Sequence, residues 1–153
     1  VAGECDFIGL NYYYHNRFKF NLFAKDGFLF EIKNENKIVS DLGWEVYPRG
    51  IYEVSRMLWQ TFRKPIFVTE NGLADAKDKK RPNFTGEHLE WLHRALQEGI
   101  DVRGYFHWSL MDNFEWDRGF TPCFGLFEMD YKNRKARPRS SAELFRKIIA
   151  SQR

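Results

Sequence analysis

Three short apolar runs organise this chain, each followed by a polar loop and then by a helical spacing of apolar residues. Each run holds β-branched or aromatic residues and stops at a turn signal, which is typical of a short buried strand. We therefore predict strands over Asp6–Tyr13, Pro65–Thr69 and Val102–Trp108. The second strand continues directly into Thr-Glu-Asn-Gly at 69–72, so it ends in a carboxylate and an Asn-Gly turn signal.

Apolar residues three or four positions apart follow each strand and predict one buried face of an α-helix. The expected boundaries are Pro48 to about Arg63 for the first helix, a Thr85 cap to Gly99 for the second, and a start after Pro138 with Ser140 or Ser141 as cap for the third. The residues expected to face the core are Ile51, Val54, Leu58 and Phe62, then Leu89, Leu92, Ala95 and Leu96, then Leu144, Phe145, Ile148 and Ile149.

The connecting segments carry signals of their own. Between the first strand and the first helix, turn signals at 25–27 and 33–36 predict a short hairpin within a long excursion, and such excursions are commonly functional. The charged stretch Lys77–Pro82 is expected to form an exposed loop. After the third strand, a long loop ends in a predicted hairpin that joins Leu126–Tyr131 to the chain near Asn133.

Strand–helix alternation three times over predicts an α/β fold with a parallel sheet. Right-handed crossovers place the three strands side by side and bring the loops that follow them to one face. That face is expected to collect Asn11–Tyr13, Glu70–Gly72 and Trp108–Trp116. In a parallel α/β barrel, this is the face that carries the chemistry.

Aromatic residues make up 18% of the 153 residues, which is more than a core of this size requires. Two interpretations are equally open at this point: a large aromatic core, or a pocket that stacks on a flat ligand such as a sugar face. The length is that of one domain able to bury a core. The first residue is Val1, close to an apolar run, and we expect a piece of a longer protein.

The formal net charge is +3, from 24 basic and 21 acidic residues with the signs interspersed, so no nucleic-acid partner is indicated. No apolar run approaches the length of a membrane span, so no membrane partner is expected. Cys5 and Cys123 lie far apart and lack metal-ligand spacing. We expect no disulfide framework, metal or cofactor, and a reducing, cytoplasmic location.

Several stretches resemble the β-glucosidase family, glycoside hydrolase family 1. Thr-Glu-Asn-Gly at 69–72 resembles the family's nucleophile motif, Phe7–Tyr13 its sixth barrel strand, and Gly104–Trp116 its eighth strand and the loop after it. Phe-Gly-Leu at 124–126 and Ser-Ala at 141–142 continue the match. The resemblance implies that residues 1–153 form the single C-terminal part of a TIM-barrel glycosidase domain, an incomplete (β/α)8 barrel with strands six to eight and their helices.

The resemblance also implies a retaining β-glycosidase site. Glu70 would be the catalytic nucleophile that attacks the anomeric carbon, and Tyr13 would hydrogen-bond it. The residues implied to bind the sugar are Asn11, Trp108, Glu115, Trp116 and Phe124. Each residue also has a plain structural interpretation, as a strand-end cap or ion pair for Glu70, core packing for the aromatic residues, and a turn or solvated loop for the others.

The family's Asn-Glu-Pro motif, which carries the general acid/base, does not occur in this chain. We expect a β-linked glycoside as the substrate of the intact enzyme and negligible turnover by this chain alone, since general acid–base catalysis contributes roughly 10²–10⁴-fold. Open sheet edges predict a partner, either the complementary N-terminal barrel segment or a second copy. The alternative is a non-catalytic carbohydrate-binding or protein-interaction module on the same scaffold.

Overall fold

The computed structural model describes residues 4–21, 29–31 and 38–151. At its centre is a three-stranded parallel sheet in the order β1 (Ile8–Asn11), β4 (Ile66–Asn71) and β5 (Val102–His107). Each predicted strand is present, and consecutive units place their strands side by side. The prediction of a parallel α/β arrangement is therefore confirmed.

The register of the sheet brings the ends of its strands together. β1 pairs with β4 from Ile8 opposite Ile66, and a register shift after Leu10 places Asn11 opposite Glu70. β4 also pairs in parallel with β5, with register shifts between Ile66 and Phe67 and between Val68 and Asn71. Because all three strands run parallel, the loops that follow them leave from one edge of the sheet.

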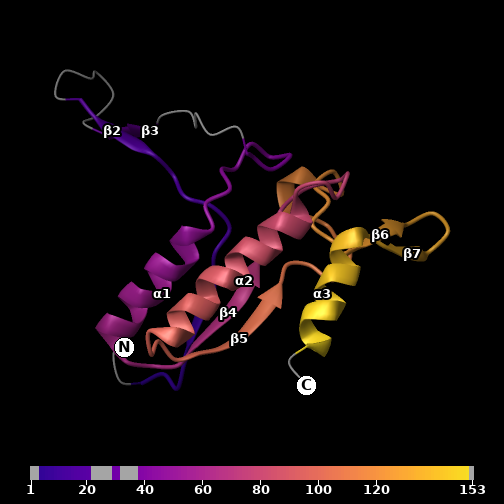
Figure 1. The fold of residues 1–153 in the computed structure, drawn as a ribbon. Coiled ribbons are helices and arrows are strands. Elements are labelled where there is room, and N and C mark those ends of the chain that lie inside the picture. The colour runs from indigo at the N-terminus through magenta and orange to yellow at the C-terminus, as the bar shows by residue number, and fades with distance from the viewer. Residues whose placement is uncertain (1–3, 22–28, 32–37, 152–153) are drawn as a thin grey trace.

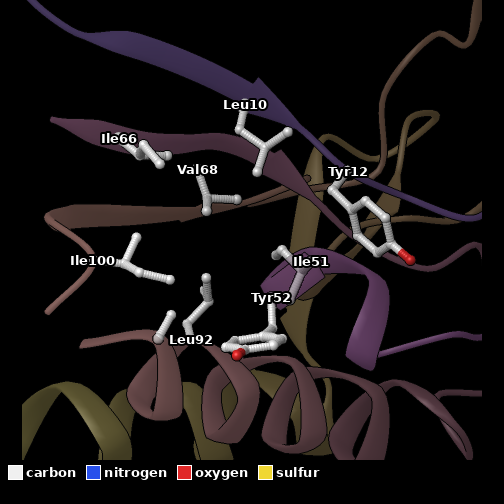
Figure 2. Packing of buried hydrophobic residues seen from close by; sticks show 9 residues of the cluster. Leu10, Tyr12, Ile51, Tyr52, Ile66, Val68, Leu92 and Ile100 are labelled. Carbon is white, nitrogen blue, oxygen red and sulfur yellow. The ribbon is translucent and has the colours of Figure 1, made fainter. Parts of the chain in front are cut away.

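Helices α1 (Arg49–Phe62), α2 (Arg81–Gln97) and α3 (Ser140–Ala150) follow the three strands. In Figure 1, α1 and α2 lie side by side across one face of the sheet. Apolar side chains between these two layers form the main core, because alternate strand residues and one stripe of each helix turn toward each other (Figure 2). Its buried members are Leu10, Tyr12, Ile51, Tyr52, Ile66, Val68, Leu92, Ala95 and Ile100.

The opposite face of the sheet carries large apolar side chains that remain exposed. Phe7 and Phe106 expose 52% and 59% of their surface, and Phe7 packs edge-to-face on Phe67 at 5.2 Å between ring centroids. β1 and β5 are the two edge strands of the sheet within the described residues. Within the described residues, the sheet thus has one helix-covered face and one face with exposed apolar side chains.

Two hairpins project from opposite sides of the molecule (Figure 1). The first pairs β2 (Phe18–Phe20) with β3 (Leu29–Glu31), and the second pairs β6 (Phe127–Asp130) with β7 (Lys135–Pro138). The second hairpin is present as predicted. The first differs from its prediction, in which the turn signals at 25–27 and 33–36 flank the hairpin, because its first strand, Phe18–Phe20, precedes both signals, and the signals themselves lie outside the described residues. Within the part of the chain that the structure describes, none of the helices is long and apolar enough to cross a membrane.

The predictions for the start of α2 are wrong in two respects. Thr85 was expected to cap this helix, but α2 begins at Arg81 and Thr85 lies inside it, buried. Lys77–Pro82 was expected to form an exposed loop. Its three lysines are exposed as predicted, but the Arg81 side chain is fully buried and that of Asp78 nearly so. The charges of Asp78 and Arg81 serve internal contacts, which a count of hydrophilic residues does not reveal.

The predicted cap of α3 and three of the inward-facing residues also need correction. Arg139 occupies the cap position, and Ser140 and Ser141 are the first two residues of the helix. The Asp78 carboxylate accepts hydrogen bonds from the Ser140 hydroxyl and from the Ser141 amide at this helix end. The residues expected in the core but found exposed, one on each helix, are Phe62, Leu96 and Ile149.

Candidate active site

The central contact of the site joins the ends of β1 and β4. The Tyr13 hydroxyl donates a hydrogen bond to Oε2 of Glu70 at 2.7 Å. The backbone supports this geometry, because the Tyr12 amide donates to the Glu70 carbonyl at 2.9 Å. Burial, and then the hydrogen bond to Glu70, raises the pKa of Tyr13, so its hydroxyl keeps its proton at neutral pH.

Asn71 fixes the strand ends around Glu70. Its buried side-chain amide donates to the Tyr12 carbonyl at 2.6 Å and accepts from the Tyr105 hydroxyl at 2.8 Å. Its own carbonyl accepts from the Trp108 amide at 2.9 Å. One asparagine therefore links all three strands of the sheet directly beside the carboxylate.

The close approach of β5 explains the glycine that follows Asn71. A Cβ atom at Gly72 would lie 1.7 Å from the Trp108 carbonyl oxygen, far inside van der Waals contact. Only glycine allows the chain after Glu70 to pass this close to Trp108. The Asn-Gly pair was interpreted from the sequence as a turn signal. In the structure, its glycine also allows the close packing against Trp108.

Trp108 and Glu115 form a second polar contact on the same side of the sheet. The Trp108 indole N–H donates to Oε1 of Glu115 at 3.0 Å, and both side chains are half-buried. Glu115 lies just before the short 3₁₀ helix η1 (Trp116–Arg118). Trp116 itself exposes 84% of its surface, so it is not packed with the other expected sugar-binding residues.

Phe124 and a residue that sequence reasoning missed, Trp44, form an aromatic wall beside Tyr13. The Phe124 ring lies edge-on to Tyr13 at 6.0 Å between centroids, and Trp44 lies 5.9 Å from Tyr13 and 6.0 Å from Phe124. Trp44 also stacks on Tyr14 at 4.6 Å. The sequence could have indicated Trp44 as a site residue by its position between a strand and the helix that follows, because all such loops meet on one face.

Asn11 lies at the end of β1, opposite Glu70 in the register of the sheet. Its side-chain oxygen accepts a hydrogen bond from the hydroxyl of Thr69, the residue before Glu70, at 2.6 Å. The structure therefore brings Tyr13, Glu70 and Phe124 together and holds Trp108 on Glu115. Among the described residues, no group of three His, Cys, Asp or Glu side chains is arranged to hold a metal ion.

The match to known proteins extends over the whole chain but over only part of each relative. A model described as glycosyl hydrolase family 1 matches residues 1–153. A β-galactosidase of Sulfolobus acidocaldarius is 40% identical over 162 residues, which cover 99% of this chain and 32% of that protein. A β-glucosidase A of Thermotoga maritima is 33% identical, with 97% of this chain and 35% of that protein covered.

Solved structures give the same result. The hyperthermophilic β-glucosidase from Pyrococcus furiosus is 39% identical and aligns with a TM-score of 0.90, covering 97% of this chain and 33% of that one. The family 1 β-glucosidase from Thermotoga maritima is 29% identical with a TM-score of 0.87, covering 96% and 35%. The chain thus spans about a third of the length of the relatives it matches.

Proposed function

The chain belongs to glycosyl hydrolase family 1, and from this premise we propose that it supplies the nucleophile-bearing part of a retaining β-glycosidase. The observation that carries the proposal is the hydrogen bond from Tyr13 to Oε2 of Glu70 at 2.7 Å. It orients a half-buried carboxylate at the loop edge of a parallel sheet, where the reactions of α/β barrels take place. The substrate class is β-linked glycosides.

In this proposal Glu70 reacts in a double displacement. One carboxylate oxygen attacks the anomeric carbon, the bond to the leaving oxygen breaks, and a covalent glycosyl ester forms on Glu70. Tyr13 holds the other oxygen, which sets the direction of attack, and because its pKa is raised it donates rather than gives up its proton. Water then hydrolyses the ester and restores the carboxylate.

The sugar would lie between Trp108 and the aromatic wall of Trp44 and Phe124. Glu115 is held at one oxygen by the Trp108 indole, and carboxylate oxygens accept more than one hydrogen bond, so Glu115 can also accept from sugar hydroxyls. The half-buried Trp108 offers apolar surface to the ring carbons, whereas Phe124 is only 2% exposed and supports the site from behind by packing edge-on against Tyr13. Trp116 on η1 would add its exposed indole to the same site.

The second carboxylate of the reaction would come from outside these residues. The sequence contains no Asn-Glu-Pro, and the chain spans about a third of its relatives. The three strands would then be strands six to eight of the barrel, with residues 1–153 as its single C-terminal part. The missing N-terminal barrel segment, or a second copy, would pair with the edges of β1 and β5 and cover Phe7 and Phe106.

Two assays test this proposal. Purified chain alone should show negligible turnover of an aryl β-glucoside, because nothing protonates the leaving group. A 2-deoxy-2-fluoro-β-glucoside with a dinitrophenolate leaving group needs no acid, so it should still transfer its sugar to Glu70, detected as a mass shift on the peptide that contains it. Glu70→Gln is the control and should not label.

Three outcomes separate the possibilities. Turnover by the chain equal to that of a full-length relative would overturn the proposed need for a second segment. Labelling at another residue would overturn the role of Glu70. Sugar binding without any labelling would favour a non-catalytic carbohydrate-binding module. A reducing, cytoplasmic location belongs to the same proposal and is supported by Cys5 and Cys123, both free thiols.

A further inference from the structure

The backbone on both sides of Phe124 is held by a buried guanidinium group. Nη2 of Arg81 donates to the Cys123 carbonyl at 2.6 Å, and Nη1 of Arg139 donates to the Gly125 carbonyl at 2.8 Å. Arg81 belongs to α2 and Arg139 directly precedes α3, so two separate elements converge on one aromatic residue. We call these two residues the arginine clamp.

Arg81 connects Phe124 to the loop that follows Glu70. Its side chain is 0% exposed and also donates to the carbonyls of Leu73 and Asp75, at 3.3 and 2.7 Å. It forms an ion pair with Asp78, an acceptor in the same loop. A buried guanidinium is costly unless its donors are satisfied, and here the satisfying groups come from the two loops that bear Glu70 and Phe124.

Arg139 connects Phe124 to the loop that carries Glu115. Its guanidinium binds the buried Asp112 carboxylate through two hydrogen bonds of 3.0 and 2.9 Å. The same carboxylate accepts from the Gly125 amide at 2.9 Å. Asp112 and Gly125 are the two ends of this loop, so the contact with Arg139 closes the loop at its base.

The two halves of the clamp are joined through Asp78. Besides pairing with Arg81, its carboxylate accepts from the Ser140 hydroxyl at 2.6 Å and from the Ser141 amide at 2.8 Å, immediately after Arg139. The guanidinium fork is planar and rigid, so contacts of this kind fix direction as well as distance. The position of Phe124 is thereby determined from both sides along the backbone.

From these contacts we infer that Arg81 and Arg139 are positioning residues. They hold Phe124, a member of the aromatic wall, in contact with Tyr13 of the Tyr13–Glu70 pair. The inference rests on the proposed function for its catalytic meaning. It states that removing the clamp moves Phe124 away from Tyr13 while the sheet and its helices remain folded. A purely architectural role predicts the opposite, namely lower stability with Phe124 still in place.

The decisive measurement is the nuclear Overhauser effect between the rings of Phe124 and Tyr13, which lie 6.0 Å apart between centroids in an edge-on arrangement. Arg81→Ala should lose this signal, and millimolar guanidinium ion should restore it by filling the vacated site. Arg146→Ala is the matched control, because Arg146 is an exposed arginine on α3 paired with Glu143. It should leave the signal unchanged.

If Arg81→Ala fails to fold, Arg81→Lys tests whether Arg81 positions Phe124. Lysine keeps the buried charge, but a single ammonium group does not reproduce the fork that reaches Asp78 and Cys123 together. The ring-to-ring signal should weaken in the folded variant, and a signal of full strength in either folded Arg81 variant would overturn the inference. Arg139→Lys, judged in the same way, tests the other half of the clamp.

Labelling of Glu70 by the fluoroglycoside separates this inference from the proposed function. In Arg81→Lys the concentration that gives half-maximal labelling should rise about tenfold, a loss of about 1.4 kcal/mol of binding, with a smaller effect on the limiting rate. Absence of labelling in the unaltered chain would reject the proposed function but not the clamp. Equal labelling by the unaltered chain and Arg81→Lys would reject the consequence of the clamp for the site.

Discussion

The hydroxyl of Tyr105 donates to the buried side-chain oxygen of Asn71 at 2.8 Å, and so ties β5 to the end of β4 beside Glu70. The Asn71 amide in turn donates to Tyr12 on the β1 side. The parallel sheet is only three strands wide in the described residues. Much of the alignment at its loop edge therefore depends on one side chain.

Asn71→Ala should destabilise the chain, because it leaves the Tyr12 carbonyl and the Tyr105 hydroxyl without their partner. Each buried group left unpaired costs about 1–3 kcal/mol. Urea unfolding followed by circular dichroism measures the loss. Asn83→Ala, at an exposed position in the first turn of α2, is the control and should change stability little. Equal stability of the two variants would contradict the role assigned to Asn71.

Tyr13→Phe should slow the reaction of Glu70 while leaving the fold unchanged. The substitution keeps the ring contacts with Trp44 and Phe124 but removes the hydrogen bond to Oε2. Hydrogen bonds to charged groups contribute about 1.5–3 kcal/mol, which corresponds to a labelling rate roughly 10- to 100-fold lower. Tyr14→Phe, on a neighbouring tyrosine stacked on Trp44, is the control. A normal rate in Tyr13→Phe would show that the contact is only structural.

The sheet and its order were predictable from the sequence because buried strands leave a local signal in composition and turn residues. The positions of Tyr13 and Glu70 followed from topology, since consecutive βα units bring their loops to one edge. Trp44 was missed because an aromatic residue in a long connection fits core packing equally well. Its partners, Tyr13 and Phe124, are distant in sequence.

The clamp was not predictable from the sequence, for a physical reason. Arg81 and Asp78 lie in a run of charged residues, and such a run ordinarily faces water. What buries Arg81 is a set of carbonyl oxygens, including that of Cys123, which is 42 residues away. Backbone acceptors have no signature in the sequence, so an arginine that binds them is indistinguishable from a solvated one. The exposed Phe62, Leu96 and Ile149 show the reverse error, in which helical periodicity overestimates the width of the buried face.

Stability should fall as the pH is lowered from about 6.5 to about 4, before most carboxylates are protonated. Burial lowers the pKa of both His88 and His107 to about 4, against an ordinary value of 6.5. In this window the unfolded chain binds protons that the folded chain does not, so acid favours unfolding. The full effect is about 3 kcal/mol for each histidine.

Urea midpoints at pH 7 and pH 4.5 measure this dependence. Asp78, Glu98 and Glu143 have pKa values lowered by their contacts, so their contributions are lost mainly at lower pH and do not explain a fall above pH 4.5. His88→Leu and His107→Leu should each remove about half of the fall. An unchanged pH dependence in both variants would assign it to other groups.

The exposed face of the sheet should make the isolated chain associate. Phe7 and Phe106 leave a broad apolar surface beside two open strand edges, and surfaces of this kind pair with other chains. Light scattering should show a mean mass above that of the monomer and rising with concentration, and Phe106→Ser should reduce it. Phe62→Ser, at an exposed position on α1 away from this face, is the control and should not. A chain that stays monomeric at high concentration and unfolds cooperatively would mean that neither a complementary barrel segment nor a second copy is needed to cover Phe106.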